Sequence, residues 1–115
     1  MNDRSQDYLE DILESITKIE EYLHDLDFLA FQRSSLLQDA VIRNIEIVGE
    51  AMGRLSEEFL RAHPNLPIQD AVSMRNFLIH QYDGVDVELL WETARDDLPL
   101  LKDQVVAILK QPAGK

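Results

Sequence analysis

The stretch SLLQDAVIRNIEIVGEAMGRLSEEFLRA, which covers residues 35–62, decides the fold class because its apolar side chains recur every three or four residues. This period places them on one face of an α-helix, and we expect a single helix from about Ser35 to about Ala62. Three further apolar residues widen the apolar surface, so we expect this helix to be covered on two sides, by its own bundle and by a second chain. The main stripe is Leu37, Ala40, Val41, Ile45, Val48, Met52, Leu55 and Phe59, and the three further residues are Ile42, Ile47 and Leu60.

Helical periodicity also marks the chain on both sides of this stretch, and the sustained apolar and polar alternation of β-strands is missing. The first helix is expected from about Ser5, as its N-cap, to about Asp27. Pro67 suits the first turn of another helix, which should run to about Tyr82. The dipeptide Asp83–Gly84 should end that helix, because Gly tolerates the left-handed backbone of a helix end.

The last helical stripe follows Asp86, which we expect to cap it. Pro99 lies inside this stripe and should either kink the helix or split it, with Asp96 or Asp97 as a new cap. The prediction is an all-α, antiparallel bundle of four helices, or of five if Pro99 divides the last one. A single domain over residues 1–115 is expected to contain them all.

The composition bounds the classes of function. The chain has 115 residues, no cysteine, and a formal net charge of −11 from 22 acidic and 11 basic residues. The lack of cysteine excludes disulfides, thiolate metal sites and a cysteine nucleophile. The acidic balance argues against broad, non-specific nucleic-acid binding, so an RNA substrate must meet a local basic pocket. No signal peptide and no apolar run of the roughly 20 residues that span a bilayer are visible, so we expect a cytoplasmic location and no membrane or DNA partner.

The helix expected after Pro67 contains the stretch MRNFLIHQYDGVD, residues 74–86, which sets polar groups beside apolar ones. Asn76 and His80 are four residues apart, so they lie about 40° from each other around the helix axis. Arg75 lies about 140° from His80, but its long side chain can reach the same pocket. Arg and His without metal ligands suggest phosphodiester chemistry on RNA, because a guanidinium binds phosphate through two parallel hydrogen bonds and an imidazole transfers protons near neutral pH.

A purely structural interpretation of the same residues stays open. Arg75 could pair with Asp70 or Asp83 while His80 caps the helix end, and spacing alone supports this at least as well. RNA transesterification adds a further requirement, since it needs a base for the 2′-hydroxyl and an acid for the leaving 5′-oxygen. One chain offers a single histidine at this place, whereas a two-fold dimer would bring two histidines and two arginines together.

Three other features have structural explanations that we favour. Glu21 and His24 have the i, i+3 spacing of a carboxylate-bridged di-metal site, but that site needs a second such pair, so we expect no metal there and a surface position for His24. Gly49 and Gly53 indicate the close approach of another helix. Asn44 lies in the apolar stripe, where its amide either bonds a neighbouring backbone group or orients a site residue.

The stretch RNFLIHQY, residues 75–82, fits the signature R-x4-H-x-Y and resembles HepT-like proteins of the HEPN superfamily. The flanks AVIRNIEIVGEAMGRLSEEF (residues 40–59) and YDGVDVELLWETARDDLPLLKDQV (residues 82–105) are similar to the second helix of that family and to its segment after the motif. Relatives often carry an aromatic residue where this chain has Ile68 and a glycine where it has Gln81. Neither position has a catalytic role in the family.

The resemblance implies a homodimeric helical bundle that acts as a metal-independent endoribonuclease toxin of a type VII-like HEPN/MNT toxin–antitoxin system. Arg75 would hold the scissile phosphate, His80 would move protons, and Asn76 would position the phosphate or His80. The implied partner is an MNT-type nucleotidyltransferase antitoxin that silences the toxin by AMPylation of Tyr82, and no cofactor is implied. The alternatives are a non-catalytic helical module that binds such a nucleotidyltransferase, and a structural helical dimer.

Overall fold

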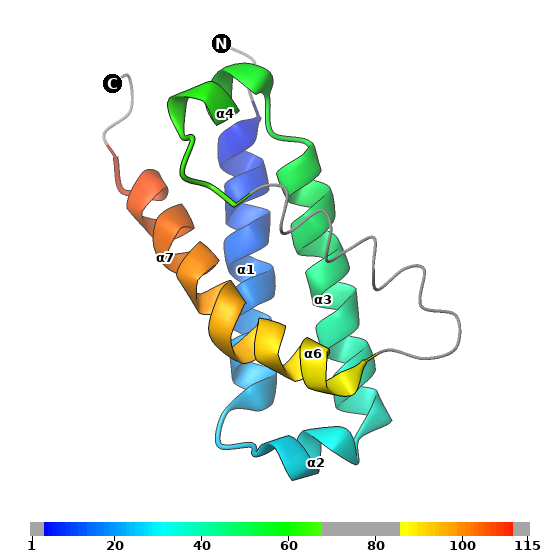
Figure 1. Ribbon diagram of the computed structural model, residues 1–115. Helices are drawn as coiled ribbons and strands as arrows, with labels where there is room; N and C mark the ends of the chain where they lie inside the picture. The colour runs from blue at the N-terminus through cyan, green and yellow to red at the C-terminus, as the bar shows by residue number, and fades with distance from the viewer. Residues whose placement is uncertain (1–3, 68–85, 112–115) are drawn as a thin grey trace.

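Figure 1 shows the computed structural model of the chain, which describes residues 4–67 and 86–111. All regular structure within these two ranges is helical, which confirms the all-α prediction. No helix in either range is long and apolar enough to cross a membrane. The first range contains α1 (Ser5–Leu23), α2 (Phe28–Gln32), α3 (Ser35–Gly53) and α4 (Glu57–Ala62), and the second contains α6 (Val87–Glu92), the π-helical turn η1 (Thr93–Asp97) and α7 (Leu98–Leu109).

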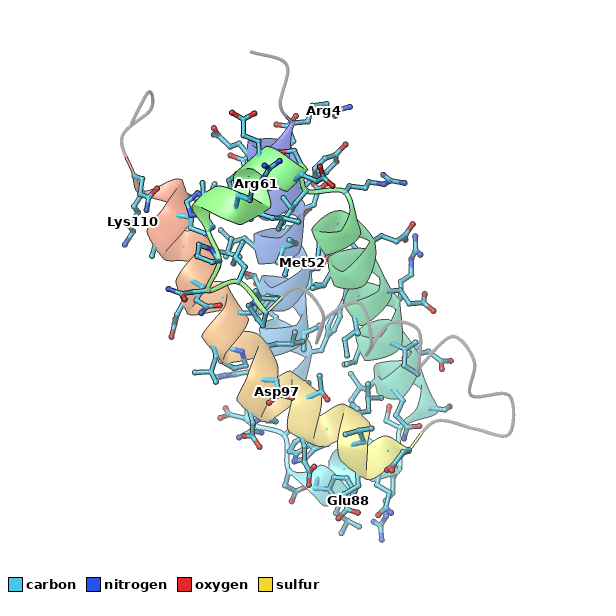
Figure 2. The ribbon with its side chains drawn as sticks, turned by 45° about the horizontal axis from the view of Figure 1, so that its top comes forward. Arg4, Met52, Arg61, Glu88, Asp97 and Lys110 are labelled. Atoms are coloured by element: carbon cyan, nitrogen blue, oxygen red, sulfur yellow. The ribbon has the colours of Figure 1, made fainter. Side chains whose placement is uncertain are left out.

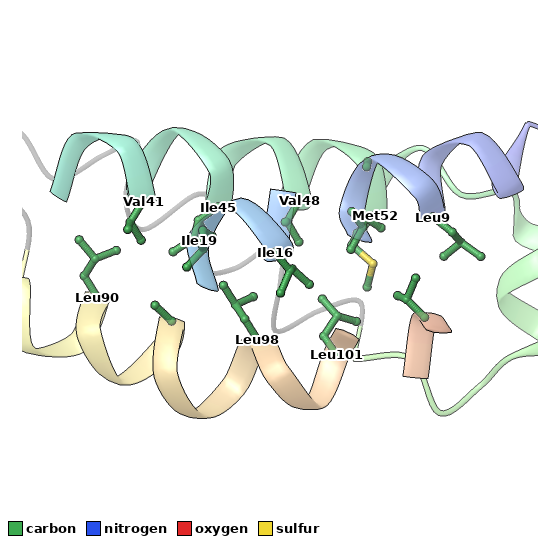
Figure 3. Close-up of a cluster of buried hydrophobic side chains, with 14 of the residues drawn as sticks. Leu9, Ile16, Ile19, Val41, Ile45, Val48, Met52, Leu90, Leu98 and Leu101 are labelled. Carbon is green, nitrogen blue, oxygen red and sulfur yellow. The ribbon is translucent and has the colours of Figure 1, made fainter. Parts of the chain in front are cut away.

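The core lies between α1, α3 and α7. Helix α1 runs antiparallel to α3 and packs against both of the other helices (Figure 1). Figure 3 shows Ile16 and Ile19 of α1 pointing into the same apolar layer as Ile45 and Val48 of α3. Each such side chain stabilises the fold by roughly 1.5–3 kcal/mol relative to an exposed position. The largest fully buried side chains are Phe31, Leu9, Ile12, Ile16, Ile19, Met52, Leu90, Val41, Val48 and Val105.

The stretch predicted as one helix over residues 35–62 forms two helices instead. Helix α3 ends at Gly53, which is exposed and has no atom within 4 Å of the place where a Cβ would stand. Close approach of another helix is therefore the wrong explanation for Gly53, whereas Gly49 is buried in α3. Ser56 then begins α4, because its Oγ accepts a 3.0 Å hydrogen bond from the Phe59 N–H in the manner of an N-cap. The apolar period continues across this turn, so periodicity alone did not reveal the break.

Helix α1 is shorter than predicted at its C-terminal end. It ends at Leu23 and not near Asp27, because Asp27 caps α2 by accepting a 2.9 Å hydrogen bond from a main-chain N–H of that helix. Asp25, between them, has a positive φ of 58°, which a continuing right-handed helix does not allow. The prediction of Ser5 as the N-cap is also wrong. Ser5 is the first residue of α1, and its buried Oγ accepts a 3.5 Å hydrogen bond from the Ser56 N–H.

The second range bends at η1, between α6 and α7 (Figure 1). The predicted cap is confirmed, since Asp86 Oδ1 accepts a 3.1 Å hydrogen bond from the Leu89 N–H. Pro99 lies in the first turn of α7. Asp97 keeps helical backbone angles and forms no side-chain cap, so the helix is kinked here and no newly capped helix begins. Pro99 lacks an N–H and its ring crowds the carbonyl of Arg95, so the wider π-helical turn before it provides the room that an α-helical turn lacks.

An aromatic cluster fixes α2 against α6. The Trp91 ring lies 5.8 Å from the Phe28 ring and 5.2 Å from the Phe31 ring, measured between centroids. The Arg95 guanidinium lies over the Trp91 ring, 4.9 Å from its centroid, and its Nη1 donates a 3.3 Å hydrogen bond to the Leu26 carbonyl. These contacts join the turn after α1 to the helices that follow Asp86.

Candidate functional site

The residues predicted to form the site, Arg75, Asn76, His80 and Tyr82, lie within residues 68–85, outside the described residues. We call residues 68–85 the motif segment. The structure therefore leaves the roles of these four residues as predictions, and it shows instead how the chain is anchored on either side of them. Apart from Pro67, the third predicted helix lies outside the described residues as well, and so does its predicted stop at Asp83–Gly84. The alternative ion-pair partners of Arg75, Asp70 and Asp83, lie there too.

The chain before the motif segment is held against α4 and α7. The His63 ring packs on the Phe59 ring with 4.4 Å between centroids, and the His63 carbonyl accepts a 3.2 Å hydrogen bond from the Leu66 N–H. Leu66 is buried and belongs to the core. The Gln104 side chain of α7 donates a 3.1 Å hydrogen bond from Nε2 to the Asn65 carbonyl. No local sequence pattern links Asn65 to Gln104, so this anchor was not predicted.

The chain after the motif segment is held against α3. Asp86 caps α6, and Leu90 of that helix is fully buried. Figure 3 shows Leu90 opposite Val41 of α3 in the apolar layer. The described chain thus stops beside α7 at Pro67 and resumes at Asp86, next to the half of α3 that holds Val41. Both flanks of the motif segment therefore rest on the same helical bundle.

Asn44 is a polar residue in the middle of α3, where it is only 5% exposed. Its Nδ2 donates a 2.9 Å hydrogen bond to the Ala40 carbonyl, one turn earlier in the same helix. The first of the two predicted alternatives, a bond to a neighbouring backbone group, is therefore confirmed. In the part of the chain that the structure describes, no hydrogen bond reaches the Asn44 Oδ1.

His24, which has a metal-ligand spacing with Glu21, is a surface residue. Its side chain is 79% exposed, and its Nε2 lies 3.3 Å from the Asp25 Oδ2. This confirms the predicted surface position at the C-terminal end of α1. Within residues 4–67 and 86–111, no group of three or more His, Cys, Asp or Glu residues is placed to hold a metal ion.

The apolar residues that widen the second predicted helix are half-buried in this single chain. Ile42 and Leu60 pack in part against the core, and Ile47 is also of intermediate exposure. A larger apolar exposure occurs at Leu36, at the start of α3. The second chain that was expected to cover α3 stays a prediction.

The family described as "Ribonuclease HepT-like" matches residues 12–108, a range that begins in α1, ends in α7 and includes the motif segment. The chain belongs to the ribonuclease HepT-like family. This confirms the resemblance that the R-x4-H-x-Y stretch indicated, and the described helices agree with the helical bundle expected of a HepT-like protein.

Curated relatives of this HepT-like chain carry ribonuclease names. "Probable ribonuclease HepT" of Thermococcus cleftensis is 44% identical over 105 residues, which cover 91% of this chain and 96% of the relative. "Putative RNase MJ1380" of Methanocaldococcus jannaschii is 40% identical over 98 residues, which cover 85% of this chain and 90% of the relative. "Gamma-glutamylcyclotransferase and putative RNase MJ0434" of the same organism is 45% identical over 104 residues, which cover 90% of this chain but 47% of the relative. No solved structure matches the HepT-like chain.

Proposed function

We propose that this HepT-like chain is a metal-independent endoribonuclease toxin of a type VII-like HEPN/MNT toxin–antitoxin system. The observation that carries the proposal is the family match over residues 12–108, which encloses the R-x4-H-x-Y stretch together with both of its anchored flanks. An arginine and a histidine at this spacing, in a chain without cysteine, suit acid–base chemistry on a phosphodiester.

Two copies of the chain supply the groups that one copy lacks. Arg75 binds the scissile phosphate and stabilises the negative charge that grows on its oxygens. The His80 of one copy accepts the proton of the 2′-hydroxyl, whose oxygen attacks the phosphorus. The His80 of the other copy donates a proton to the 5′-oxygen as the bond between phosphorus and that oxygen breaks. The products are a 2′,3′-cyclic phosphate and a 5′-hydroxyl, and Asn76 positions the phosphate or the histidine.

Tyr82 is the residue through which the activity is regulated in this proposal. It follows His80 by two residues, and in this proposal a group attached to its hydroxyl stands close to the reacting phosphate. An MNT-type nucleotidyltransferase transfers AMP from ATP to the Tyr82 hydroxyl and releases pyrophosphate. The added phosphate is anionic and bulky, so it both repels the RNA backbone and fills the space that the RNA needs.

The acidic surface restricts how RNA can be bound. The whole chain carries 22 acidic residues against 11 basic ones, and on α1 four acidic side chains are exposed within the first turns. Binding therefore depends on few phosphate contacts near Arg75, and its salt dependence should be shallow compared with that of a broad basic surface. The four exposed residues of α1 are Asp7, Glu10, Asp11 and Glu14.

The decisive experiment compares RNA cleavage in EDTA by the wild type and by His80→Ala. The proposal expects cleavage by the wild type and loss of cleavage in the variant. His24→Ala is the matched control, because it also removes an imidazole but from a side chain that is 79% exposed and contacts Asp25. Equal cleavage by the wild type and His80→Ala ends the assignment.

AMPylation is tested by intact mass after incubation with a purified MNT-type nucleotidyltransferase and ATP. We expect a gain of one or more AMP units in the wild type and none in Tyr82→Phe. Tyr22→Phe is the matched control, because Tyr22 is an exposed tyrosine on α1. An equal mass gain in Tyr82→Phe would place the modification on another residue.

A second function, a non-catalytic module that binds the nucleotidyltransferase, is favoured by the net charge of −11, which does not attract RNA. Its signature is a stable complex with the nucleotidyltransferase, together with purified wild-type protein that leaves RNA intact. The EDTA cleavage experiment distinguishes the two functions, since only the ribonuclease cleaves RNA without its partner.

A further inference from the structure

Helix α3 carries a regular row of charged residues on the side that faces away from the core. Asp39, Arg43, Glu50 and Arg54 are exposed, and Ile47, in the middle of the row, is half-buried. At 100° of rotation per residue, these side chains fall within about 80° of the helix circumference, so they form one stripe. Figure 2 shows polar side chains extending from α3 on the side away from α1 and α7. We call these five residues the α3 outer stripe.

Most charges of the α3 outer stripe are not neutralised by the described part of the chain. Arg43 Nη1 lies 3.9 Å from the Oε1 of Glu46, which is half-buried beside the stripe. Within residues 4–67 and 86–111, no ion pair involves Asp39, Glu50 or Arg54. Water hydrates exposed charges well, so their exposure alone indicates no partner. The order of the signs along the helix is more informative.

The α3 outer stripe is complementary to itself when it is read in opposite directions. From the start of α3 its members are negative, positive, apolar, negative and positive. A two-fold axis perpendicular to the helix at Ile47 sets α3 antiparallel to the α3 of a second copy. Asp39 then faces Arg54 of the other copy, Arg43 faces Glu50, and the two isoleucines meet at the axis. A parallel pairing would instead set each charge against an identical one.

We propose that two copies of this chain associate through the α3 outer stripe, with their α3 helices antiparallel. The two-fold axis doubles each contact, so the interface has two ion pairs between Asp39 and Arg54 and two between Arg43 and Glu50. This inference rests on the proposed function, because it names the surface on which the two copies of the ribonuclease meet.

The same pairing covers an exposed apolar side chain. Leu36 is 79% exposed, and it lies one turn before Asp39 on the same side of α3. In the antiparallel arrangement the apolar stem of Arg54 from the second copy lies along Leu36, while its guanidinium reaches Asp39. Burial of Leu36 and Ile47 adds an apolar contribution to an interface whose ion pairs alone contribute little.

The net charge of the chain restricts where two copies can meet. Each copy carries a formal charge of −11, so two acidic surfaces repel each other. The α3 outer stripe has two acidic and two basic residues and therefore brings balanced charge to the contact. The outer side of α1 does not, because its first turns expose Asp7, Glu10, Asp11 and Glu14.

Charge reversal tests the pairing in the 115-residue chain, with sedimentation velocity as the measurement. Arg43→Glu sets carboxylates against each other at two symmetry-related places, and Glu50→Arg does the same with guanidinium groups. We expect a dimeric wild type, and in each variant a dimer Kd higher by about tenfold or more. Both side chains are exposed, so circular dichroism should show an unchanged helical content.

A mixture of the two variants gives the sharper result. Arg43→Glu and Glu50→Arg carry opposite charges at both contact points, so a one-to-one mixture should form a heterodimer about as tight as the wild-type dimer. Native mass spectrometry identifies the heterodimer by its mass. The double variant Arg43→Glu/Glu50→Arg should form a homodimer again. If neither the mixture nor the double variant associates, the proposed pairing is wrong.

Lys18→Glu and Glu14→Arg on α1 are the matched controls, because they make the same changes of net charge at exposed positions outside the stripe. We expect both controls to dimerise nearly as tightly as the wild type. Equal weakening in the controls and in the stripe variants would assign the effect to net charge and overturn the inference. A monomeric wild type, or stripe variants that dimerise like the wild type, would overturn it as well.

RNA cleavage in EDTA separates failure of this inference from failure of the proposed function. If the wild-type dimer follows the charge-reversal pattern but leaves RNA intact, the interface is correct and the proposed function fails. If the wild type cleaves RNA while Arg43→Glu and Glu50→Arg stay dimeric, the proposed function holds and this interface is wrong. If both are correct, cleavage is lost with the dimer in each single variant and returns in their mixture.

Discussion

The Gln104 side chain of α7 donates a 3.1 Å hydrogen bond to the Asn65 carbonyl, and this bond joins α7 to the chain three residues before the motif segment begins. Leu66, between them, is buried in the core. One flank of the predicted site is therefore fixed by a residue that lies 39 positions later in the sequence. The chain next to the motif segment is thus held by α7, although α7 carries no predicted site residue.

Gln104→Ala should loosen this flank without unfolding the protein. The bond is exposed, so we expect a loss of less than about 1 kcal/mol in the free energy of unfolding. The Leu66 amide should exchange with solvent faster, and RNA cleavage should fall by roughly two- to fivefold. Hydrogen exchange and kcat/KM are the measurements, and Gln6→Ala, which removes an exposed bond to Glu10 on α1, is the control. Identical exchange at Leu66 in the wild type and Gln104→Ala would contradict the anchoring role.

Ser56→Ala should destabilise the start of α4. The Ser56 Oγ accepts a 3.0 Å hydrogen bond from the Phe59 N–H, and loss of an N-cap costs about 1 kcal/mol. The measurement is urea unfolding followed by circular dichroism. Ser56→Asp keeps a capping oxygen and should retain most of the stability. The cap assignment fails if the alanine and aspartate variants lose equal stability.

Leu90→Ala should be strongly destabilising, because Leu90 is fully buried between α6 and the α3 layer. Removal of a buried leucine side chain typically costs about 2–5 kcal/mol, from lost burial and the cavity left behind. Leu100→Ala removes the same atoms from a side chain that is 66% exposed, and should change stability by at most about 0.5 kcal/mol. Urea unfolding of both variants measures the difference, and similar losses in the two would show that α6 does not pack as described.

RNA cleavage should have a bell-shaped dependence on pH if two copies of His80 act as base and acid. At low pH the base copy is protonated and cannot accept the 2′-hydroxyl proton. At high pH the acid copy has lost the proton that the leaving 5′-oxygen needs, so the rate falls on both sides. The measurement is kcat/KM over pH, with circular dichroism at each pH to confirm folding. A rate that rises with pH and then stays constant over the folded range would remove the acid role.

The sequence by itself determined the helical fold class, the cap at Asp86, the surface position of His24 and the family, because each depends on residues close together along the chain. Helical periodicity, a cap and the R-x4-H-x-Y stretch are all local patterns, and a helix brings residues three or four apart to one face whatever surrounds it. Local chemistry also favoured the Asn44 bond to the Ala40 carbonyl, which the structure contains.

Only the tertiary structure decided where the helices stop and what frames the motif segment. Helix α1 ends at Leu23 before Asp27 caps α2, and α3 ends at Gly53 before Ser56 caps α4. The apolar period continues across both breaks, and the breaks allow the chain to turn back onto its core. The bond between Gln104 and Asn65 exists because folding brings α7 beside residues far away in the sequence. Spacing along a chain does not encode such contacts, since they depend on how whole helices pack and not on the backbone between neighbouring residues.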